Sequence, residues 1–254
     1  MTKLSTDVNK KRPCNKHIVI FPAFSENLNE ILETQGRIKI GIPHHHIVIE
    51  GPLGVGKTSL AIKLAERING QVLLENTEDN PFLNKFYQNP KRYGFQIQIF
   101  FLLRRYQHSL ELGQKGLFKS AIVSDYLFDK DRIFAGVNLD DKEFWLYEQL
   151  FQLLKRRVTP PDLVIFLQAK TEVLMERIRK REKEYEKPIS FRYLDEINQS
   201  FNNFFFHYTD SPILVVNASD IDFVNIPEDF EDLVNEIRKT RSGTQYYIPM
   251  SSRK

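Results

Sequence analysis

Short apolar runs alternate with longer amphipathic segments along this chain from about residue 46 onward. Five of these runs are rich in β-branched residues and bounded by polar residues, which is typical of strands. Three are almost continuously apolar, as expected for parallel strands covered on both faces. The pattern predicts strands at 46–50, 71–75, 121–125, 163–168 and 213–216.

The segments between and after these runs have the spacing of amphipathic helices. They predict helices at 58–69, about 93–112, about 141–157, 171–181, 192–207 and 228–239. Alternation of strand and helix predicts an α/β fold of one domain, 46–239, with a doubly wound, five-stranded parallel sheet flanked by helices.

Both ends of the chain lie outside this alternation. Residues 1–45 are an extension without an assignable motif, with a short strand predicted at 17–21 and a capped helix at 25–35. The consecutive histidines 44–46 are the run-in to the first strand rather than a metal site, because successive strand residues point to opposite faces. The polar tail, 240–254, is predicted to be a surface arm.

The first predicted strand leads into a G-x-x-x-x-G-K-[ST] motif, and a helical segment follows it, as this motif requires. Its glycines let backbone N–H groups point at phosphate oxygens, and the helix N-terminus adds positive potential. The motif lysine is expected on the β- and γ-phosphates, and the threonine hydroxyl on Mg²⁺. The sequence therefore predicts an ATP site made by Gly51, Gly54, Val55, Gly56, Lys57, Thr58 and Ser59.

Composition excludes several classes of protein. The net charge of +3 in 254 residues is too small to indicate a nucleic-acid surface. A single cysteine, Cys14, excludes an internal disulfide framework and favours a reducing, cytoplasmic location. No apolar run approaches the ~18 residues of a membrane span, so we expect no membrane partner.

Two predicted strands end in carboxylates, the second strand in Glu75 and the third in Asp125. In such a sheet, ligands bind beyond the carboxyl ends of the strands. One acid there can bind Mg²⁺, and the other can accept a proton from an attacking hydroxyl. The alternative is that each acid only caps the next helix or loop.

Gln98 and Arg105 are seven residues apart on a predicted helix and so share a face. Their neighbours are apolar nearly all round, so both side chains need partners. An amide and a guanidinium suit the edge of a nucleobase. An internal salt bridge or a solvated face is the alternative.

A basic stretch, residues 177–187, follows the fourth strand and a helical segment. Such a run is often a solvated helix. Beside a phosphate loop it is also the place of a mobile basic lid, whose cations stabilise charge on a transferred phosphoryl group. We expect this basic lid to contribute Arg177, Arg181 and Lys183.

Taken together, these segments resemble the deoxynucleoside kinase family, especially its bacterial purine-deoxynucleoside members, from about residue 47 to 216. The resemblance is carried by IEGPLGVGKTS, LLENTEDNPFLNKFY, FQIQIFFLLRRYQ, SDYLFDKDRIFA and RIRKREKEYEKPISFRYL. It implies a thymidylate kinase-like fold and transfer of the ATP γ-phosphoryl group to the 5′-hydroxyl of a deoxynucleoside.

The resemblance also implies roles for individual residues. Glu75 matches the general base, Asp125 keeps the metal-binding acid, and Lys57, Arg177 and Arg181 act on the transferred phosphate. Residues expected to bind the acceptor are Tyr87 and Glu186 on the 3′-hydroxyl, and Gln98, Arg105, Asp131 and a stacking Phe134 on the base. The Asp131 match spans a loop one residue shorter than the family's.

One position departs from the family pattern, which has an arginine directly after the third-strand acid. Tyr126 stands there instead. A lid residue or Arg132 could replace the missing cation, or the reaction could proceed without it.

The leading hypothesis is an ATP- and Mg²⁺-dependent deoxynucleoside kinase of nucleoside salvage that acts on a purine. A thymidylate kinase-like enzyme acting on a monophosphate and a non-catalytic nucleotide switch are the alternatives. The resemblance implies a homodimer packed through the apolar stripe of helix 141–157, which by spacing alone could equally be core.

Overall fold

A computed structural model describes residues 42–115 and 120–249 of the chain, which all belong to one compact unit, Ile40–Lys254. The strand and helix predicted at 17–21 and 25–35 lie outside the described residues.

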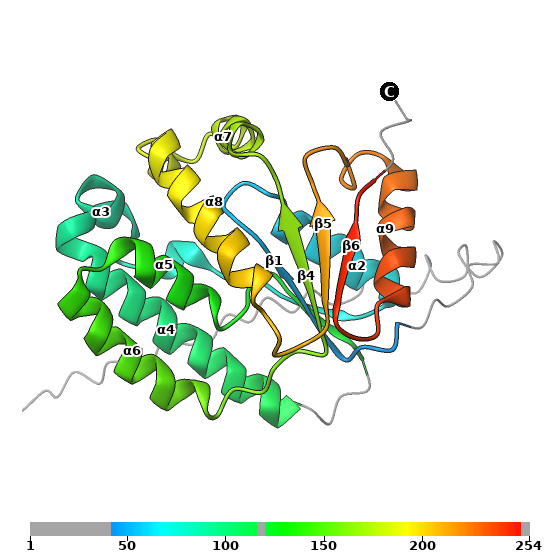
Figure 1. The fold of residues 1–254 in the computed structure, drawn as a ribbon, viewed down its shortest axis with the longest axis horizontal. Helices are drawn as coiled ribbons and strands as arrows, with labels where there is room; N and C mark the ends of the chain where they lie inside the picture. Colours follow the sequence, from blue (N-terminus) through cyan, green and yellow to red (C-terminus); the bar gives the residue numbers. More distant parts are fainter. Residues whose placement is uncertain (1–41, 116–119, 250–254) are drawn as a thin grey trace, which may run out of the picture. The chain divides into compact units, whose positions relative to one another are not determined.

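All the strands of the described sheet are parallel, and their order is β2-β3-β1-β4-β5-β6 (Figure 1). The doubly wound α/β class is therefore confirmed, but the sheet has six strands rather than five. The strands are β1 His46–Glu50, β2 Gln71–Leu73, β3 Ile122–Ser124, β4 Leu163–Gln168, β5 Ile213–Asn217 and β6 Thr244–Tyr247.

The additional strand, β6, lies in the segment predicted to be a surface arm, so that prediction was wrong for residues 244–247. It pairs in parallel with β5, with Thr244 opposite Ile213. Its sequence, TQYY, is polar and its side chains are half-buried or exposed. At a sheet edge, backbone hydrogen bonds to one neighbour hold a strand that needs no apolar run. Hydrophobic patterning therefore missed it.

The predicted helices are all present, with ends within a few residues of the prediction. They are α2 Lys57–Ile68, α4 Pro90–Lys115, α6 Asp141–Lys155, α7 Thr171–Lys180, α8 Phe191–Phe206 and α9 Pro227–Lys239. Two further helices, α3 Leu83–Gln88 and α5 Lys130–Asn138, and the 3₁₀ turns η1 Thr77–Asp79 and η2 Glu184–Glu186 were not predicted. Both missed helices are short, and short helices carry little periodic signal.

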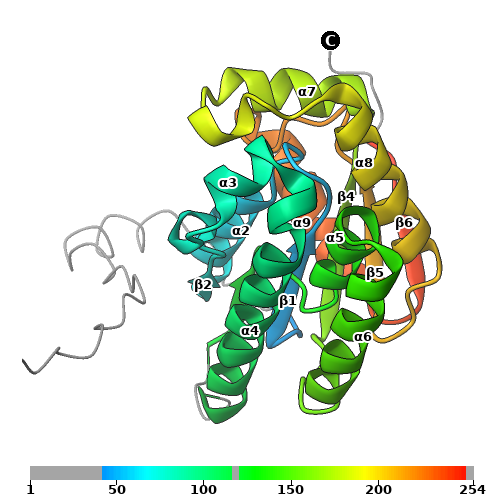
Figure 2. The ribbon, with the colours of Figure 1, turned by 90° about the vertical axis from the view of Figure 1, so that its left-hand side faces the viewer.

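Alternate residues of the central strands pack on opposite faces of the sheet. Ile47 and Ile49 of β1 pack with α2 and α9, whereas Val48 packs with α8 and α5. In Figure 1, α4, α5 and α6 lie next to one another on the left of the sheet. In Figures 1 and 2, α7 lies across the carboxyl ends of the strands. The site lies at that end of the sheet.

Candidate active site

The phosphate loop, residues 51–58, joins the end of β1 to the start of α2. Gly54 has a φ of 84° and Gly56 a φ of 107°, in the left-handed region that favours glycine. A Cβ atom on Gly54 would also lie 2.8 Å from the carbonyl oxygen of Leu174 in α7. The loop therefore needs glycine for its backbone conformation and for its contact with α7.

Lys57, the first residue of α2, folds back over this loop. Its Nζ donates to the carbonyl oxygens of Gly51 (2.7 Å) and Pro52 (3.0 Å). Burial, and then the positive charge of Lys130, lower the pKa of Lys57 to about 8, although carboxylates including Glu50 oppose the shift. An anion bound here would stabilise the ammonium form.

Glu50, at the end of β1, was not singled out in the sequence. It is fully buried and accepts hydrogen bonds from the backbone N–H groups of Gly51 (3.0 Å) and Leu127 (2.8 Å). Burial raises the pKa of Glu50, while Lys130 and Lys57 lower it. Glu50 thus fixes the start of the phosphate loop against the segment after β3.

Asp125 follows β3 directly and connects the phosphate loop to the segment after β2. Its Oδ2 accepts from the Thr58 hydroxyl at 2.6 Å, and its Oδ1 accepts from the backbone N–H of Glu75 at 2.7 Å. Burial raises the pKa of Asp125, and these two hydrogen bonds oppose the shift. A carboxylate and a hydroxyl are the oxygen ligands that Mg²⁺ prefers. Over residues 42–115 and 120–249, no group of three or more His, Cys, Asp and Glu could hold a metal ion.

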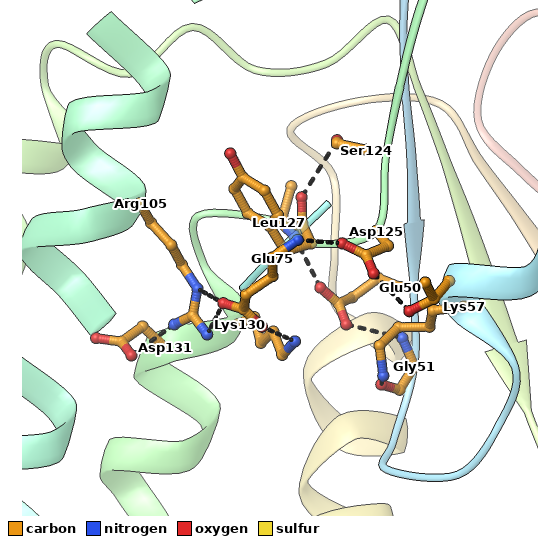
Figure 3. A network of polar contacts seen from close by, with 12 residues as sticks. Glu50, Gly51, Lys57, Glu75, Arg105, Ser124, Asp125, Leu127, Lys130 and Asp131 are labelled. Atoms are coloured by element: carbon orange, nitrogen blue, oxygen red, sulfur yellow. Dashed lines mark hydrogen bonds and ion pairs between the residues drawn. The ribbon is translucent and has the colours of Figure 1, made fainter. Parts of the chain in front are cut away.

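Glu75 lies two residues beyond β2, and its two carboxylate oxygens have different cationic partners (Figure 3). Oε1 accepts from Arg105 Nε at 2.7 Å, and Oε2 accepts from Lys130 Nζ at 2.8 Å. Burial alone would raise the pKa of Glu75, but Arg105 and Lys130 outweigh it and hold the pKa at about 2. Glu75 is therefore ionised at neutral pH.

Arg105, on α4, is buried and joins Glu75 to Asp131 on α5. Its Nη1 donates to Asp131 Oδ1 at 2.6 Å, and Tyr147 Oη of α6 donates to Asp131 Oδ2 at 2.9 Å. Burial raises the pKa of Asp131 to about 6, against the effects of Arg105 and Tyr147. The internal salt bridge considered for Arg105 is thus present, and it runs through the predicted site.

The remaining predicted acceptor residues lie in buried surroundings. Gln98 is 3% exposed, and its Oε1 has no hydrogen-bond partner among the described residues. Glu186, 7% exposed, likewise has an unpartnered Oε2. Tyr87 stacks on Tyr185, with ring centroids 6.4 Å apart, and the negative charge of Glu186 contributes to the raised pKa of Tyr87 after burial. The amide of Gln98 and the carboxyl group of Glu186, buried without full hydrogen bonding, are suited to a polar ligand.

Phe134 packs edge-on against Phe201 of α8, with ring centroids 5.7 Å apart. It lies one turn beyond Asp131 on α5. Its expected stacking on a base stays a prediction.

The basic lid divides between two neighbourhoods. Arg177 donates to the carbonyl oxygens of Ala218 (2.9 Å) and Val55 (3.3 Å), so it lies against the phosphate loop. Lys183 instead contacts Tyr185 Oη (2.8 Å) and Glu78 (3.3 Å), and Arg181 lies 3.9 Å from Glu186.

A cavity of about 640 Å³ opens between the phosphate loop, the end of α7 and the loop after β5. Its lining includes Gly54, Gly56, Ser59, Arg177, Arg181 and Phe223. Phe223 was missed from the sequence; its position in the loop after the last predicted strand was the available signal. The cavity is continuous with the phosphate-binding segment and has an aromatic ring and cations in its wall.

Three side chains near β3 bear on the cation that Tyr126 replaces in the family pattern. Tyr126 is buried, with its hydroxyl 3.1 Å from His108 Nδ1. Arg132 pairs with Glu148 at 2.8 Å on the exposed side of α5. Lys130, the first residue of α5, contacts Glu75 instead. The sequence analysis did not single out Lys130, because a lysine between two aspartates gives no local signal that it is buried.

Comparisons with known proteins agree with this geometry. The family model described as "Deoxynucleoside kinase" matches residues 47–241. Deoxyguanosine kinase of Bacillus subtilis is 32% identical over 204 residues, 76% of this chain and 96% of the relative. Deoxyadenosine/deoxycytidine kinase of the same organism is 30% identical over 207 residues, 77% of this chain and 93% of the relative.

Among solved structures, deoxyadenosine kinase from M. mycoides with bound dATP matches with a TM-score of 0.67 and 26% identity, over 76% of this chain and 98% of that one. No helix within residues 42–115 and 120–249 is long and apolar enough to cross a membrane. The matched span contains the phosphate loop, the cluster around Glu75 and the basic lid, and the chain therefore belongs to the deoxynucleoside kinase family, whose members transfer a phosphoryl group to an alcohol acceptor.

Proposed function

We propose that this protein transfers the γ-phosphoryl group of ATP to the 5′-hydroxyl of a purine deoxynucleoside. The observation that carries the proposal is the position of Glu75. Its backbone N–H is bonded to Asp125, which holds Thr58 of the phosphate loop, and its carboxylate is bonded to the buried Arg105–Asp131 pair. These contacts connect the carboxylate to the phosphate loop on one side and to the Arg105–Asp131 pair on the other, which supports a base between the ATP and the nucleoside.

In the proposed reaction, the 5′-oxygen attacks the γ-phosphorus while the bond from phosphorus to the ADP oxygen breaks. The hydroxyl proton passes to Glu75, and ADP leaves with the bonding electron pair. Alignment of the two reactants and stabilisation of charge on the phosphoryl oxygens supply most of the catalysis in such reactions. We assign the charge stabilisation to Lys57, Arg177 and Arg181, and the ATP base to the cavity that Phe223 lines.

Thr58 and Asp125 would hold a Mg²⁺ ion, since both offer oxygen atoms beside the phosphate loop. Bound Mg²⁺ would neutralise charge on the β- and γ-phosphates.

A purine acceptor is supported by the buried amide of Gln98, which offers both donors and an acceptor to a base edge. Tyr87 and Glu186 would bind the 3′-hydroxyl, and Phe134 and Asp131 would complete the base site. Two of the relatives, deoxyguanosine kinase of B. subtilis and deoxyadenosine kinase of Dictyostelium discoideum, are named for purine deoxynucleosides.

A monophosphate acceptor is less well supported by the geometry. An acceptor phosphate needs unpaired cations around it. Arg105 is already neutralised by Glu75 and Asp131. The acceptor side is therefore better suited to a neutral nucleoside.

We also propose a cytoplasmic salvage enzyme that acts as a homodimer. The single cysteine supports a reducing compartment. Helix α6 buries Tyr147 and Phe151 but leaves Trp145 65% and Leu153 62% exposed. An apolar outer face of this kind suits a second copy of the chain. Sedimentation of the wild-type protein and a Leu153→Asp variant tests the dimer, which the variant should weaken.

The function is tested by ADP release from MgATP with each of the four deoxynucleosides and with dTMP as acceptors. Acceleration by deoxyadenosine or deoxyguanosine is the expected result. Acceleration by dTMP alone would favour the monophosphate kinase, and ATP hydrolysis that no acceptor accelerates would favour the nucleotide switch.

A further inference from the structure

Lys130 is a buried cation that belongs to neither the phosphate loop nor the basic lid. It is 6% exposed and begins α5, five residues after Asp125. A buried ammonium is unfavourable unless it is paired. Its Nζ lies 2.8 Å from Glu75 Oε2, which supplies the pair.

The charge of Lys130 reaches both halves of the site. Burial, the largest effect on Glu75, raises its pKa, whereas the charges of Arg105 and then Lys130 lower it. Lys130 also lowers the pKa of Lys57 and, against burial, that of Glu50, both at the phosphate loop. Lys130 therefore lies between the carboxylate that would take the proton and the lysine that would bind the phosphates (Figure 3).

The two cations on Glu75 are held very differently. Arg105 bonds Glu75 and Asp131 at once, and Tyr147 in turn holds Asp131. Lys130, by contrast, has Glu75 as its one side-chain hydrogen-bond partner within the described residues. A lysine is a point charge on a flexible stem, whereas an arginine is a rigid fork. Arg105 can keep Glu75 in position while Lys130 exchanges partners.

We propose that Lys130 is a catalytic cation of the phosphoryl transfer. In this structure its ammonium donates to Oε2 of Glu75. When ATP and the nucleoside are bound, its ammonium contacts the γ-phosphoryl group and leaves Oε2 to the 5′-hydroxyl. The O5′–P bond then forms as the P–O bond to ADP breaks, the hydroxyl proton passes to Glu75, and Lys130 remains protonated throughout. This role rests on the proposed kinase activity and supplies the charge that Tyr126 does not.

The test compares the steady-state kinetics of Lys130→Met, Lys130→Gln and Lys130→Arg with wild type. The glutamine can keep a hydrogen bond to Glu75 but carries no charge. The matched control is Lys155→Met, because Lys155 is a partly buried lysine of α6 that pairs with Asp129 and Asp210. Binding of a fluorescent ATP analogue and the thermal unfolding temperature establish that each variant is folded.

Both uncharged variants should lose about 10²-fold or more in kcat, the usual effect of removing one preorganised charge-stabilising group. Their KM for ATP and for nucleoside should stay within about threefold of wild type, because the lost contact forms in the transition state. Lys130→Arg should recover part of kcat, and Lys155→Met should behave as wild type.

A Lys130→Gln enzyme with near wild-type kcat would overturn the proposal, since Lys130 would then only position Glu75. An equal loss in Lys155→Met would overturn it too. If wild type itself phosphorylates no nucleoside, the proposed function fails; if it does and the uncharged variants do as well, only the role of Lys130 fails.

Discussion

The donor and acceptor sides of this site are built in different ways. On the donor side, the phosphate loop is shaped by glycines with positive φ and by backbone carbonyls that hold Lys57. On the acceptor side, the buried charges of Arg105, Lys130 and Asp131 and the half-buried carboxylate of Glu75 hold one another. One side is fixed by backbone conformation within a short segment. The other is fixed by side chains from three segments of the chain: the residues after β2, helix α4 and helix α5.

This difference determines how each side should fail. A defect in the phosphate loop strains the local backbone and should weaken ATP binding. A defect in the charge cluster leaves a buried partner unpaired and should act on turnover or on the acceptor. Substitutions on the two sides should therefore separate in their kinetic constants.

The largest expected effect is that of Glu75→Gln. The amide cannot accept the hydroxyl proton, so kcat should fall by about 10² or more, with ATP binding retained. Steady-state kinetics and titration with an ATP analogue measure the two quantities. Glu231→Gln, at the Arg67 ion pair, is the control. Near-normal turnover in Glu75→Gln would remove Glu75 from its role.

Gly54→Ala should act on the donor side alone. The new Cβ would meet the Leu174 carbonyl oxygen at 2.8 Å, at a φ of 84°, and such strain amounts to about 1–3 kcal/mol. The KM for ATP should rise about tenfold, with little change in the KM for nucleoside. Gly136→Ala in α5 is the control, because its Cβ would meet only an ordinary contact at 3.9 Å. An unchanged KM for ATP in Gly54→Ala would contradict the backbone account.

Gln98→Leu should separate binding from stability on the acceptor side. It removes a buried amide with an unpartnered oxygen, so the unfolding temperature without ligand should stay the same or rise. The KM for nucleoside should rise about tenfold through the loss of one or two hydrogen bonds. A rise in the KM for ATP instead would mean that Gln98 contributes to the ATP site rather than to the nucleoside site.

The smallest expected effect is a pH dependence confined to the acceptor side. Asp131 has a pKa of about 6 in the folded protein, raised by burial from 3.8. As pH falls from 7 to 5 it becomes protonated and its pairing with Arg105 weakens, so the KM for nucleoside should rise severalfold while that for ATP stays constant.

The raised pKa of Asp131 has the opposite effect on the free energy of unfolding, which should be larger at low pH. Because the folded chain holds this proton more tightly, Asp131 contributes more stability at low pH and loses it as pH rises through the window from about 4 to 6. Subtracting the pH–stability curve of Asp131→Asn from that of wild type isolates this contribution. A difference curve that is flat across the window would contradict the raised pKa.

Parts of the fold with a local sequence pattern could be predicted, and parts that depend on contacts between distant residues could not. Strand–helix alternation predicted the sheet class because buried parallel strands must be apolar. It missed β6 because an edge strand with polar side chains, TQYY, gives no such signal. It missed α5 because this helix is short and begins with charged residues, of which Lys130 and Asp131 are buried in ion pairs.

Within the site, the phosphate loop was readable from contiguous residues, and the strand-end rule singled out Glu75 and Asp125. The partners of Glu75 are 30 and 55 residues away along the chain. No local pattern shows that Lys130 turns inward while Arg132 turns outward to Glu148. Only the packing of α4, α5 and α6 decides which charges are buried together.

The central claim is that ATP on the donor side and a deoxynucleoside on the acceptor side react directly with each other. The most direct test is the ratio of the two products, ADP and phosphorylated nucleoside. Wild-type protein is incubated with MgATP and deoxyguanosine or deoxyadenosine, and ADP and phosphorylated nucleoside are quantified together by chromatography and ³¹P NMR. The account predicts one deoxynucleoside 5′-monophosphate for each ADP. ADP formed without phosphorylated nucleoside, or phosphate found on another hydroxyl, would contradict it.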